Sequence, residues 1–191
     1  ADEAMVGLVG GTNFKDKSIR KAQKKIVTDN TASAMSHAFI IGEKRWYGKR
    51  WIIESDFDLR GPQMLVGVQE NRIEKYFDDK AYPNLALLDF NLSKEHKDQI
   101  LKESLELVAS RAPYSFKEIF GIMVSFAGEQ KRKKENSFSK DNSFVCSTLV
   151  QHLYAKAGIH FNPEVSGRHI TPEDIYNTKA SCKREALIRI K

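Results

Sequence analysis

Strand-like segments fill the first half of this chain and helical segments the second, and this order is the strongest constraint on its fold. The strand candidates are short, rich in β-branched and aromatic residues, and separated by polar turns: residues 5–9, 36–42, 46–55, 62–68 and 84–90. A block of strands followed by a block of helices is typical of an α+β domain with an antiparallel sheet. We therefore expect an antiparallel sheet, or a partial barrel, packed against helices.

The spacing of apolar residues predicts most of the helices. They are expected at residues 14–27, 94–111, 116–127, 142–156 and 171–176. Ser93 is a candidate N-cap, Pro172 suits the first turn of the last helix, and Gly158 suits the position after the preceding one. Residues 128–142 are polar and charged and predict a flexible loop, and residues 186–190 could return as an edge strand.

The size and composition of the chain indicate a single globular domain over residues 1–191. A chain of 191 residues with 41% hydrophobic residues can bury a substantial core, and only 5 Pro and 11 Gly exclude a collagen-like or disordered chain. The longest apolar run, residues 119–128, is far shorter than the ~20 residues that span a bilayer, so we expect a soluble protein. Two cysteines are too few for a disulfide framework or a structural zinc site.

The formal net charge of +6 comes largely from two basic segments, residues 15–25 and residues 131–134. Such runs are typical of solvated surface, and they favour peripheral contact with an anionic surface. Neither run is interleaved with aromatic residues that could stack on bases, so we expect no nucleic-acid partner. No phosphate-binding glycine loop and no metal-ligand motif is present, so we expect no cofactor and no metal.

Cys146 is the candidate nucleophile. It lies within about the first turn of a predicted helix, where partial positive charge and free N–H groups stabilise a thiolate. However, Cys146 also shares spacings of four, three and four with Val150, Leu153 and Ala157, which fits an inert cysteine on an apolar stripe. A neighbouring base would decide between these interpretations. Cys182, in a charged tail, suggests no role.

His37 and Glu54 could supply that base and its orienting group. His37 begins an apolar strand, where an imidazole is either a hydrogen-bonded core residue or a functional one. We take the two strands to pair through an even loop centred between Arg45 and Trp46. His37 then directly faces Glu54, close enough for a carboxylate to hold an imidazole. A turn centred on Gly48 would shift the register and break this alignment.

Together, Cys146, His37 and Glu54 provide the groups needed for covalent acyl transfer. Their order resembles that of the permuted papain-like amidases and peptidases, relatives of the NlpC-type cell-wall hydrolases. Three segments look like the histidine strand, the following strand and the cysteine helix of that family: SHAFII, WIIES and NSFVCSTLVQHLYAKAGI. Two more resemble the segments on either side of that helix: PYSFKEIFG, with Tyr114, and HITPEDIYNT. The resemblance covers about residues 5–178.

This resemblance implies a circularly permuted papain-like fold and a cysteine hydrolase, an amidase or peptidase acting on cell-wall peptides or another acylated amine. It also suggests the cell envelope of a bacterium as the location. Where family members usually carry a Gly-Asp pair, this chain has Gly10 and Gly11. Two alternatives stay open: a thiol-dependent acyltransferase or phospholipase acting on lipids, and a non-catalytic binding module. The expected partner is thus a small-molecule, peptide or lipid substrate.

Overall fold

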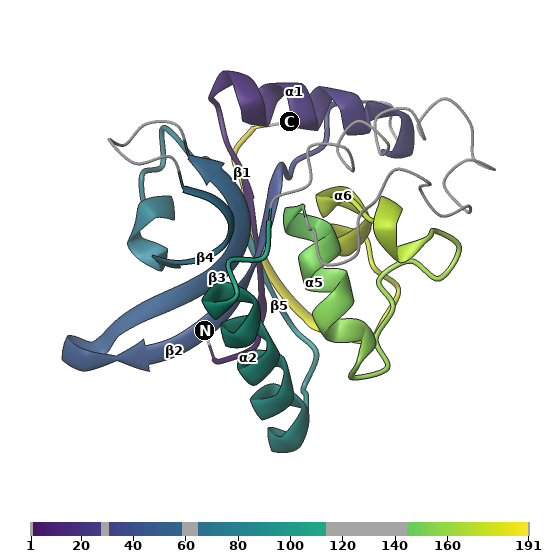
Figure 1. Ribbon diagram of the computed structural model, residues 1–191. Coiled ribbons are helices and arrows are strands. Elements are labelled where there is room, and N and C mark those ends of the chain that lie inside the picture. The colour runs from purple at the N-terminus through teal and green to yellow at the C-terminus, as the bar shows by residue number, and fades with distance from the viewer. Residues whose placement is uncertain (1, 28–30, 59–64, 114–144, 191) are drawn as a thin grey trace.

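A computed structural model describes residues 2–27, 31–58, 65–113 and 145–190 of the chain (Figure 1). Six strands form one open sheet in the order β4-β3-β2-β1-β5-β6, with every neighbouring pair antiparallel. Their bounds are β1 Val6–Gly10, β2 His37–Arg45, β3 Lys49–Asp58, β4 Leu65–Arg72, β5 Asn84–Asp89 and β6 Lys183–Ile188. The expected α+β class with an antiparallel sheet is confirmed, and the described strands form an open sheet with β4 and β6 at its edges.

The α-helices of the described ranges are α1 Phe14–Ala22, α2 Lys94–Ala109, α5 Cys146–Ala155 and α6 Pro172–Tyr176. Short 3₁₀ helices are η1 Gln23–Ile26, η2 Trp46–Gly48, η3 Ile73–Tyr76 and η4 Gly167–His169. The Ser93 hydroxyl caps α2 by accepting the His96 N–H at 3.3 Å, as its position predicted. Among these described helices, none combines the length and apolar character required to cross a bilayer.

The central strands of the sheet bury both of their faces, because side chains alternate along each strand. One face packs against α2 and α5 through Leu8, Ala38, Ile40, Ile53, Ile100, Leu149 and Leu153. The other face carries a smaller cluster that packs against η3: Val9, Phe39, Ile41, Ile52 and Tyr76. In Figure 1, α2 and α5 lie beside the central strands, and α1 runs across one end of the sheet. Figure 1 also shows the β2–β3 hairpin projecting away from the body.

Several boundaries differ from the sequence-based expectation. The fourth strand continues to Arg72 rather than ending at residue 68, because an edge strand tolerates polar residues that the hydrophobic pattern does not detect. The cysteine helix begins at Cys146, directly after the extended residue Val145, and the predicted start at residues 142–143 lies outside the described residues. The last strand runs from Lys183 to Ile188, earlier than the predicted 186–190. The predicted helix at 116–127 and loop at 128–142 lie outside the described residues.

Helix α1 differs from expectation in the face that it buries. The buried side chains on and just after the helix are polar, namely Asp16, Arg20 and Gln23. The apolar residues whose spacing predicted the helix, Ile19, Ala22 and Ile26, are only half-buried. The Arg20 guanidinium donates to the Ser33 carbonyl at 2.7 Å, and the Gln23 amide donates to the Met35 carbonyl at 2.8 Å. These bonds fasten the helix to the segment that leads into β2. Helix α1 is therefore held by buried polar contacts at the end of the sheet where His37 lies.

Candidate active site

Cys146 is the first residue of α5, so the thiol lies at the N-terminus of the helix. The helix starts here because the Thr148 hydroxyl accepts the Val145 N–H at 3.0 Å and because the first helical bond joins the Leu149 N–H to the Val145 carbonyl. The N–H groups of residues 146–148 precede that first bond and point out of the helix end. The Ser147 hydroxyl donates to the Ile170 carbonyl at 2.7 Å and ties the helix start to the segment before α6.

The helix packs as its sequence pattern predicted. Val150 and Leu153 are buried in the core, and Ala157 is half-buried against it. Cys146 is buried as well, but the surroundings of its side chain are not purely apolar. The charge of Cys146 and a side-chain hydrogen bond with it raise the pKa of His37, and the same charge raises the pKa of Lys15. The structure therefore brings together the cysteine and the histidine that sequence reasoning paired.

His37 is the first residue of β2, and its ring is held from two sides. The Nε2 atom lies 2.7 Å from the Glu54 carboxylate, which leaves Nδ1 for the sulfur. Burial by itself would lower the pKa of His37, but the negative charge and hydrogen bond of Cys146, followed by the Glu54 carboxylate, raise it well above its usual value. The surroundings therefore favour the imidazolium form.

Glu54 is fully buried and accepts hydrogen bonds from four side chains. Its Oε2 atom is bonded to His37 and to the Tyr76 hydroxyl, at 2.7 and 2.5 Å. Its Oε1 atom accepts from the Asn71 amide at 2.7 Å and from the Lys75 ammonium at 2.6 Å. Burial would raise the pKa of Glu54, but the bond and charge of His37 and the charge of Lys75 lower it well below its ordinary range. Glu54 is therefore a fixed, ionised acceptor for the imidazole.

The route by which His37 meets Glu54 is not the predicted one. The turn is a three-residue loop with Tyr47 at φ 59° and Gly48 at φ 70°, and the register shifts between Ile41 and Lys44. Ile40 therefore pairs with Ile53, and extending this register puts Asp56, not Glu54, opposite His37. The predicted direct pairing is wrong by two residues. A slip of two keeps both side chains on the same face, where a diagonal pair can still touch.

Asp56 is a site residue that the sequence did not reveal. One of its carboxylate oxygens lies within 4.8 Å of ligand atoms of both His37 and Glu54. Asp56 accepts from the Lys15 ammonium at 2.7 Å, and the Lys75 ammonium lies 3.6 Å from its other oxygen. No spacing rule connects these five residues, because they come from α1, two strands and η3. The polar end of β4 and the start of η3, which contain Asn71 and Lys75, are the sequence signal that could have indicated partners for Glu54.

The cluster of His37, Glu54 and Asp56 also has the donor types that could hold a metal ion. However, both carboxylates already face ammonium groups, with Lys75 on Glu54 and Lys15 on Asp56. A divalent cation placed among them would meet two fixed positive charges at short range. The donor set therefore fits acid–base chemistry with lysine counter-ions better than metal binding.

The aromatic residues of the β2–β3 turn lie away from this site. Trp46 and Tyr47 are 81% and 84% exposed at the tip of the hairpin, and their rings stack at 5.2 Å. Trp51 is half-buried, with the Arg45 guanidinium 5.4 Å from its ring centroid. Since His37 is at the opposite end of β2, none of these three aromatic side chains can line the site. Tyr114 lies outside the described residues.

Comparison with known proteins adds no relative: no protein-family model matches the chain, and no curated protein matches it significantly.

Proposed function

We propose that this protein is a cysteine hydrolase, an amidase or peptidase with a circularly permuted papain-like fold. Cys146 is its nucleophile, His37 its general base and acid, and Glu54 the group that orients the imidazole. One observation carries the proposal: a buried imidazole is bonded to a carboxylate through Nε2 at 2.7 Å and also interacts with a thiol at a helix N-terminus. Nucleophile, base and orienting group in contact are the signature of covalent catalysis.

The same contacts argue against an inert buried cysteine. A structural cysteine requires only apolar neighbours, and the rest of the α5 stripe provides them through Val150 and Leu153. A structural histidine requires one hydrogen-bond partner, whereas the partner of His37 is itself fixed by three further donors. Removing several charged groups from water has a large desolvation cost, and their mutual attraction can fail to repay it. The arrangement supports a site maintained for chemistry.

In the proposed acylation step, the Cys146 thiolate attacks the carbonyl carbon of the amide and a carbon–sulfur bond forms. The carbonyl oxygen takes up the negative charge and is stabilised by N–H groups at the start of α5. When the carbon–nitrogen bond breaks, the imidazolium of His37 gives its proton to the departing nitrogen. The products of this step are an amine and a thioester on Cys146.

In the deacylation step, neutral His37 accepts a proton from water while the water oxygen attacks the thioester carbonyl. The carbon–sulfur bond then breaks, releasing a carboxylic acid and restoring the thiolate–imidazolium pair. Glu54 stays ionised throughout and keeps Nε2 directed away from the sulfur. The overall balance is hydrolysis of one amide by one water molecule, with no cofactor consumed.

The test compares the two thiols of one chain. Near pH 6.5, iodoacetamide should label Cys146 well before Cys182, as followed by mass spectrometry of the peptides, because only Cys146 has an imidazole partner. His37→Ala should remove most of this difference, and Cys182→Ser should leave the labelling rate of Cys146 unchanged. Preferential labelling of Cys182 in the folded protein would rule out Cys146 as the nucleophile.

The alternative, an acyltransferase or phospholipase acting on lipids, shares the thioester but takes its acyl group from a lipid. Incubating the protein with amide substrates, and separately with phospholipid vesicles, distinguishes the two by their products. A free acid and amine from the amides support the hydrolase. Transfer of a fatty acyl chain to Cys146 or to an added amine would favour the lipid-acting enzyme instead. A binding module would form no thioester with either substrate.

A further inference from the structure

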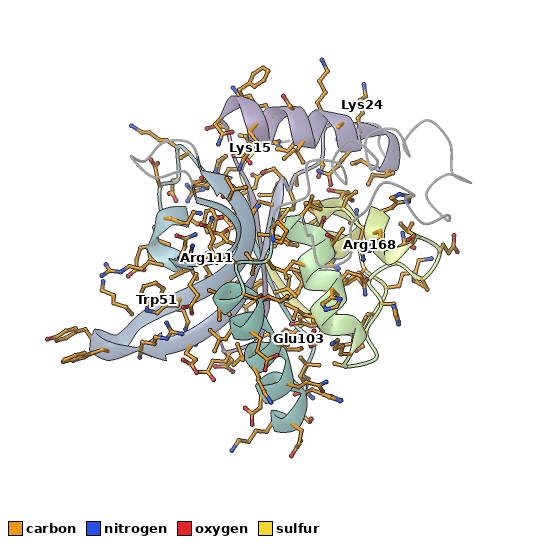
Figure 2. All side chains as sticks on the ribbon, in the orientation of Figure 1. Lys15, Lys24, Trp51, Glu103, Arg111 and Arg168 are labelled. Carbon is orange, nitrogen blue, oxygen red and sulfur yellow. The ribbon has the colours of Figure 1, made fainter. Side chains whose placement is uncertain are left out.

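Helix α1 presents lysines on the side that does not pack against the protein. Lys17 and Lys21 are exposed and four residues apart, and exposed Lys24 continues the same side into η1. Figure 2 shows Lys24 on the side of this segment that faces away from the sheet. Within the described part of the chain, none of these ammonium groups forms an ion pair. The only acidic residue of α1, Asp16, is buried, so this side of the helix carries positive charge alone.

Phe14 adds an apolar group to the same side. It is the first residue of α1, and it is 88% exposed. At about 3.6 residues per turn, Phe14, Lys17 and Lys21 lie within about 60° of one another around the helix axis. We call the side formed by Phe14, Lys17, Lys21 and Lys24 the α1 outer face. An exposed phenyl ring beside several lysines is the combination with which basic peripheral helices bind the surface of a bilayer.

The buried contacts of this segment keep the α1 outer face turned to solvent. Arg20 and Gln23 lie on another side of the segment and donate to the carbonyls of Ser33 and Met35, at 2.7 and 2.8 Å. The helix cannot rotate its lysines inward, or bring Phe14 into the core, without breaking these buried bonds. The outer face is therefore a fixed surface of the fold.

The charges of the outer face are unfavourable for the helix that carries them. Lys17 and Lys21 are like charges four residues apart, and such a pair destabilises a helix. Lys17 also belongs to the first turn of α1, where the helix dipole disfavours a cation. The folding of α1 therefore gains nothing from the charge of Lys17. Positive charge placed against the preference of the helix indicates that the outer face binds an anionic partner.

We propose that the α1 outer face docks on an anionic phospholipid bilayer, with its lysines at the headgroup phosphates and the Phe14 ring at the boundary with the acyl chains. Charge complementarity favours an anionic surface. The ring of Phe14 favours a bilayer over a polyanion that has no apolar layer. Because α1 crosses the end of the sheet where His37 lies, docking would bring that end to the membrane (Figure 1). This inference goes beyond the proposed function and does not rest on it.

The test measures how the whole chain partitions onto vesicles, by co-sedimentation. Vesicles of equal parts phosphatidylcholine and phosphatidylglycerol should bind the protein, and vesicles of phosphatidylcholine alone should not. Each lysine near an anionic surface contributes about fivefold to the partition coefficient, so Lys17→Gln combined with Lys21→Gln should lower it about 20- to 30-fold. Phe14→Ala should lower it about three- to tenfold, because no ring enters the bilayer. About 1 M salt should weaken wild-type binding, since it shortens the screening length.

Lys94→Gln combined with Lys102→Gln is the matched control, because it removes two exposed lysines from another helix, α2. It should leave the partition coefficient within about twofold of wild type, since charges far from the bilayer are screened. Lys17→Glu separates binding from stability. A glutamate in the first turn, four residues before Lys21, should keep or raise the melting temperature, whereas binding should fall about 20- to 30-fold. Equal losses in the two double variants would overturn the inference in favour of a general effect of net charge.

Tryptophan fluorescence shows which end of the molecule meets the bilayer. Exposed Trp46 lies at the tip of the β2–β3 hairpin, at the opposite end of β2 from His37, so its emission should not change when vesicles are added to the wild type. In Phe14→Trp combined with Trp46→Phe, the emission should shift to shorter wavelength because the new indole enters the bilayer. A shift in the wild type and none in this double variant would mean that the hairpin tip docks, and the inference would be wrong.

A DNA oligonucleotide distinguishes a bilayer from any other polyanion. At equal phosphate concentration, we expect the protein to bind the oligonucleotide more weakly than the anionic vesicles, because DNA offers no apolar layer to Phe14. Binding to the oligonucleotide that is as tight as binding to vesicles, together with vesicle binding that Phe14→Ala does not weaken, would overturn the inference in favour of a surface that recognises phosphate charge alone.

Discussion

Replacing Glu54 by glutamine tests the centre of the proposed site with almost no change in shape. The carboxylate has two oxygens, and each faces two donors: His37 and Tyr76 at Oε2, Asn71 and Lys75 at Oε1. An amide keeps one oxygen and introduces an N–H₂ group at the other position. One pair of donors must therefore face another donor, and the protein has to change a protonation state or lose hydrogen bonds.

The chemistry of the four neighbours determines which side the amide nitrogen takes. The Lys75 ammonium has no acceptor atom, so an N–H₂ group cannot be placed against it without repulsion. His37 can accept through Nε2 when that nitrogen carries no proton, and the Tyr76 hydroxyl can also accept. We therefore expect the amide nitrogen of Glu54→Gln to face His37. The ring is then neutral, with its proton on Nδ1, and the imidazolium is disfavoured.

The expected decrease in the alkylation rate follows from the hydrogen bond to a carboxylate that the imidazolium loses. A hydrogen bond to a charged partner contributes about 1.5–3 kcal/mol, which corresponds to about one to two pKa units at His37. The population of the thiolate–imidazolium pair should fall by the same factor. We therefore expect alkylation of Cys146 near pH 6.5 to slow about 10- to 100-fold in Glu54→Gln. The effect should be smaller than that of His37→Ala, which removes the ring altogether.

The assay follows iodoacetamide labelling of Cys146 by mass spectrometry, with Cys182 as the internal reference. Glu103→Gln is the control, because Glu103 on α2 also joins a histidine and a lysine, His152 at 2.8 Å and Lys156 at 2.6 Å, in a partly exposed cluster (Figure 2). It should not change the labelling. If Glu54→Gln reacted at the wild-type rate while its circular dichroism melting curve showed a folded protein, Glu54 would not be the group that stabilises the imidazolium.

Four further outcomes are expected. Tyr76→Phe keeps the ring stacked on Phe39 but removes the bond to Glu54, so urea titration should show a loss of about 1 kcal/mol and labelling should slow only a few-fold. Gly67→Ala should lower stability by at least about 2 kcal/mol, because Gly67 has φ 121° and a Cβ there would meet a backbone carbonyl at 2.4 Å. Gln69→Met should raise stability by about 1 kcal/mol on melting, because the shielded Gln69 amide has no hydrogen-bond partner within the part of the chain that the structure describes. Because the pKa of Glu54 is lowered from 4.5 on folding, its stabilisation is present above that pH and is lost as the pH falls; urea titrations between about pH 3 and 6 should show a flatter acid dependence in Glu54→Gln.

The sequence predicted the site to the extent that local rules determine it. A cysteine at a helix start can be recognised from the apolar stripe of the helix, although the exact first residue depended on Thr148 and Val145 rather than on a standard cap. The pairing of His37 with Glu54 was predicted through a wrong register. The two side chains are nevertheless in contact, because the predicted register is wrong by two residues. A shift by an even number of residues leaves each side chain on the same face of the sheet.

The rest of the site was not predictable from local pattern. Lys15 and Asp56 are 41 residues apart, and they meet only because α1 is held across the end of the sheet by buried polar contacts. Lys75 and Tyr76 reach Glu54 because β4 pairs with β3 and the chain then turns into η3. These contacts depend on the register between β4 and β3. That register cannot be derived from the pattern of the β2–β3 hairpin alone. Tertiary arrangement therefore supplied the residues that hold the carboxylate.

The spacing of the site along the chain has a consequence for how the protein is made. His37 and Glu54 are 17 residues apart on one hairpin, whereas Cys146 begins a helix near the end of the described chain. During synthesis from the N-terminus, local contacts of this kind form first, and distant ones must wait for the chain to emerge. The hairpin can therefore close long before residue 146 leaves the ribosome. In the proposed mechanism the thiol gains its base only when α5 docks, so a chain that has not yet extended past α5 carries no activated nucleophile.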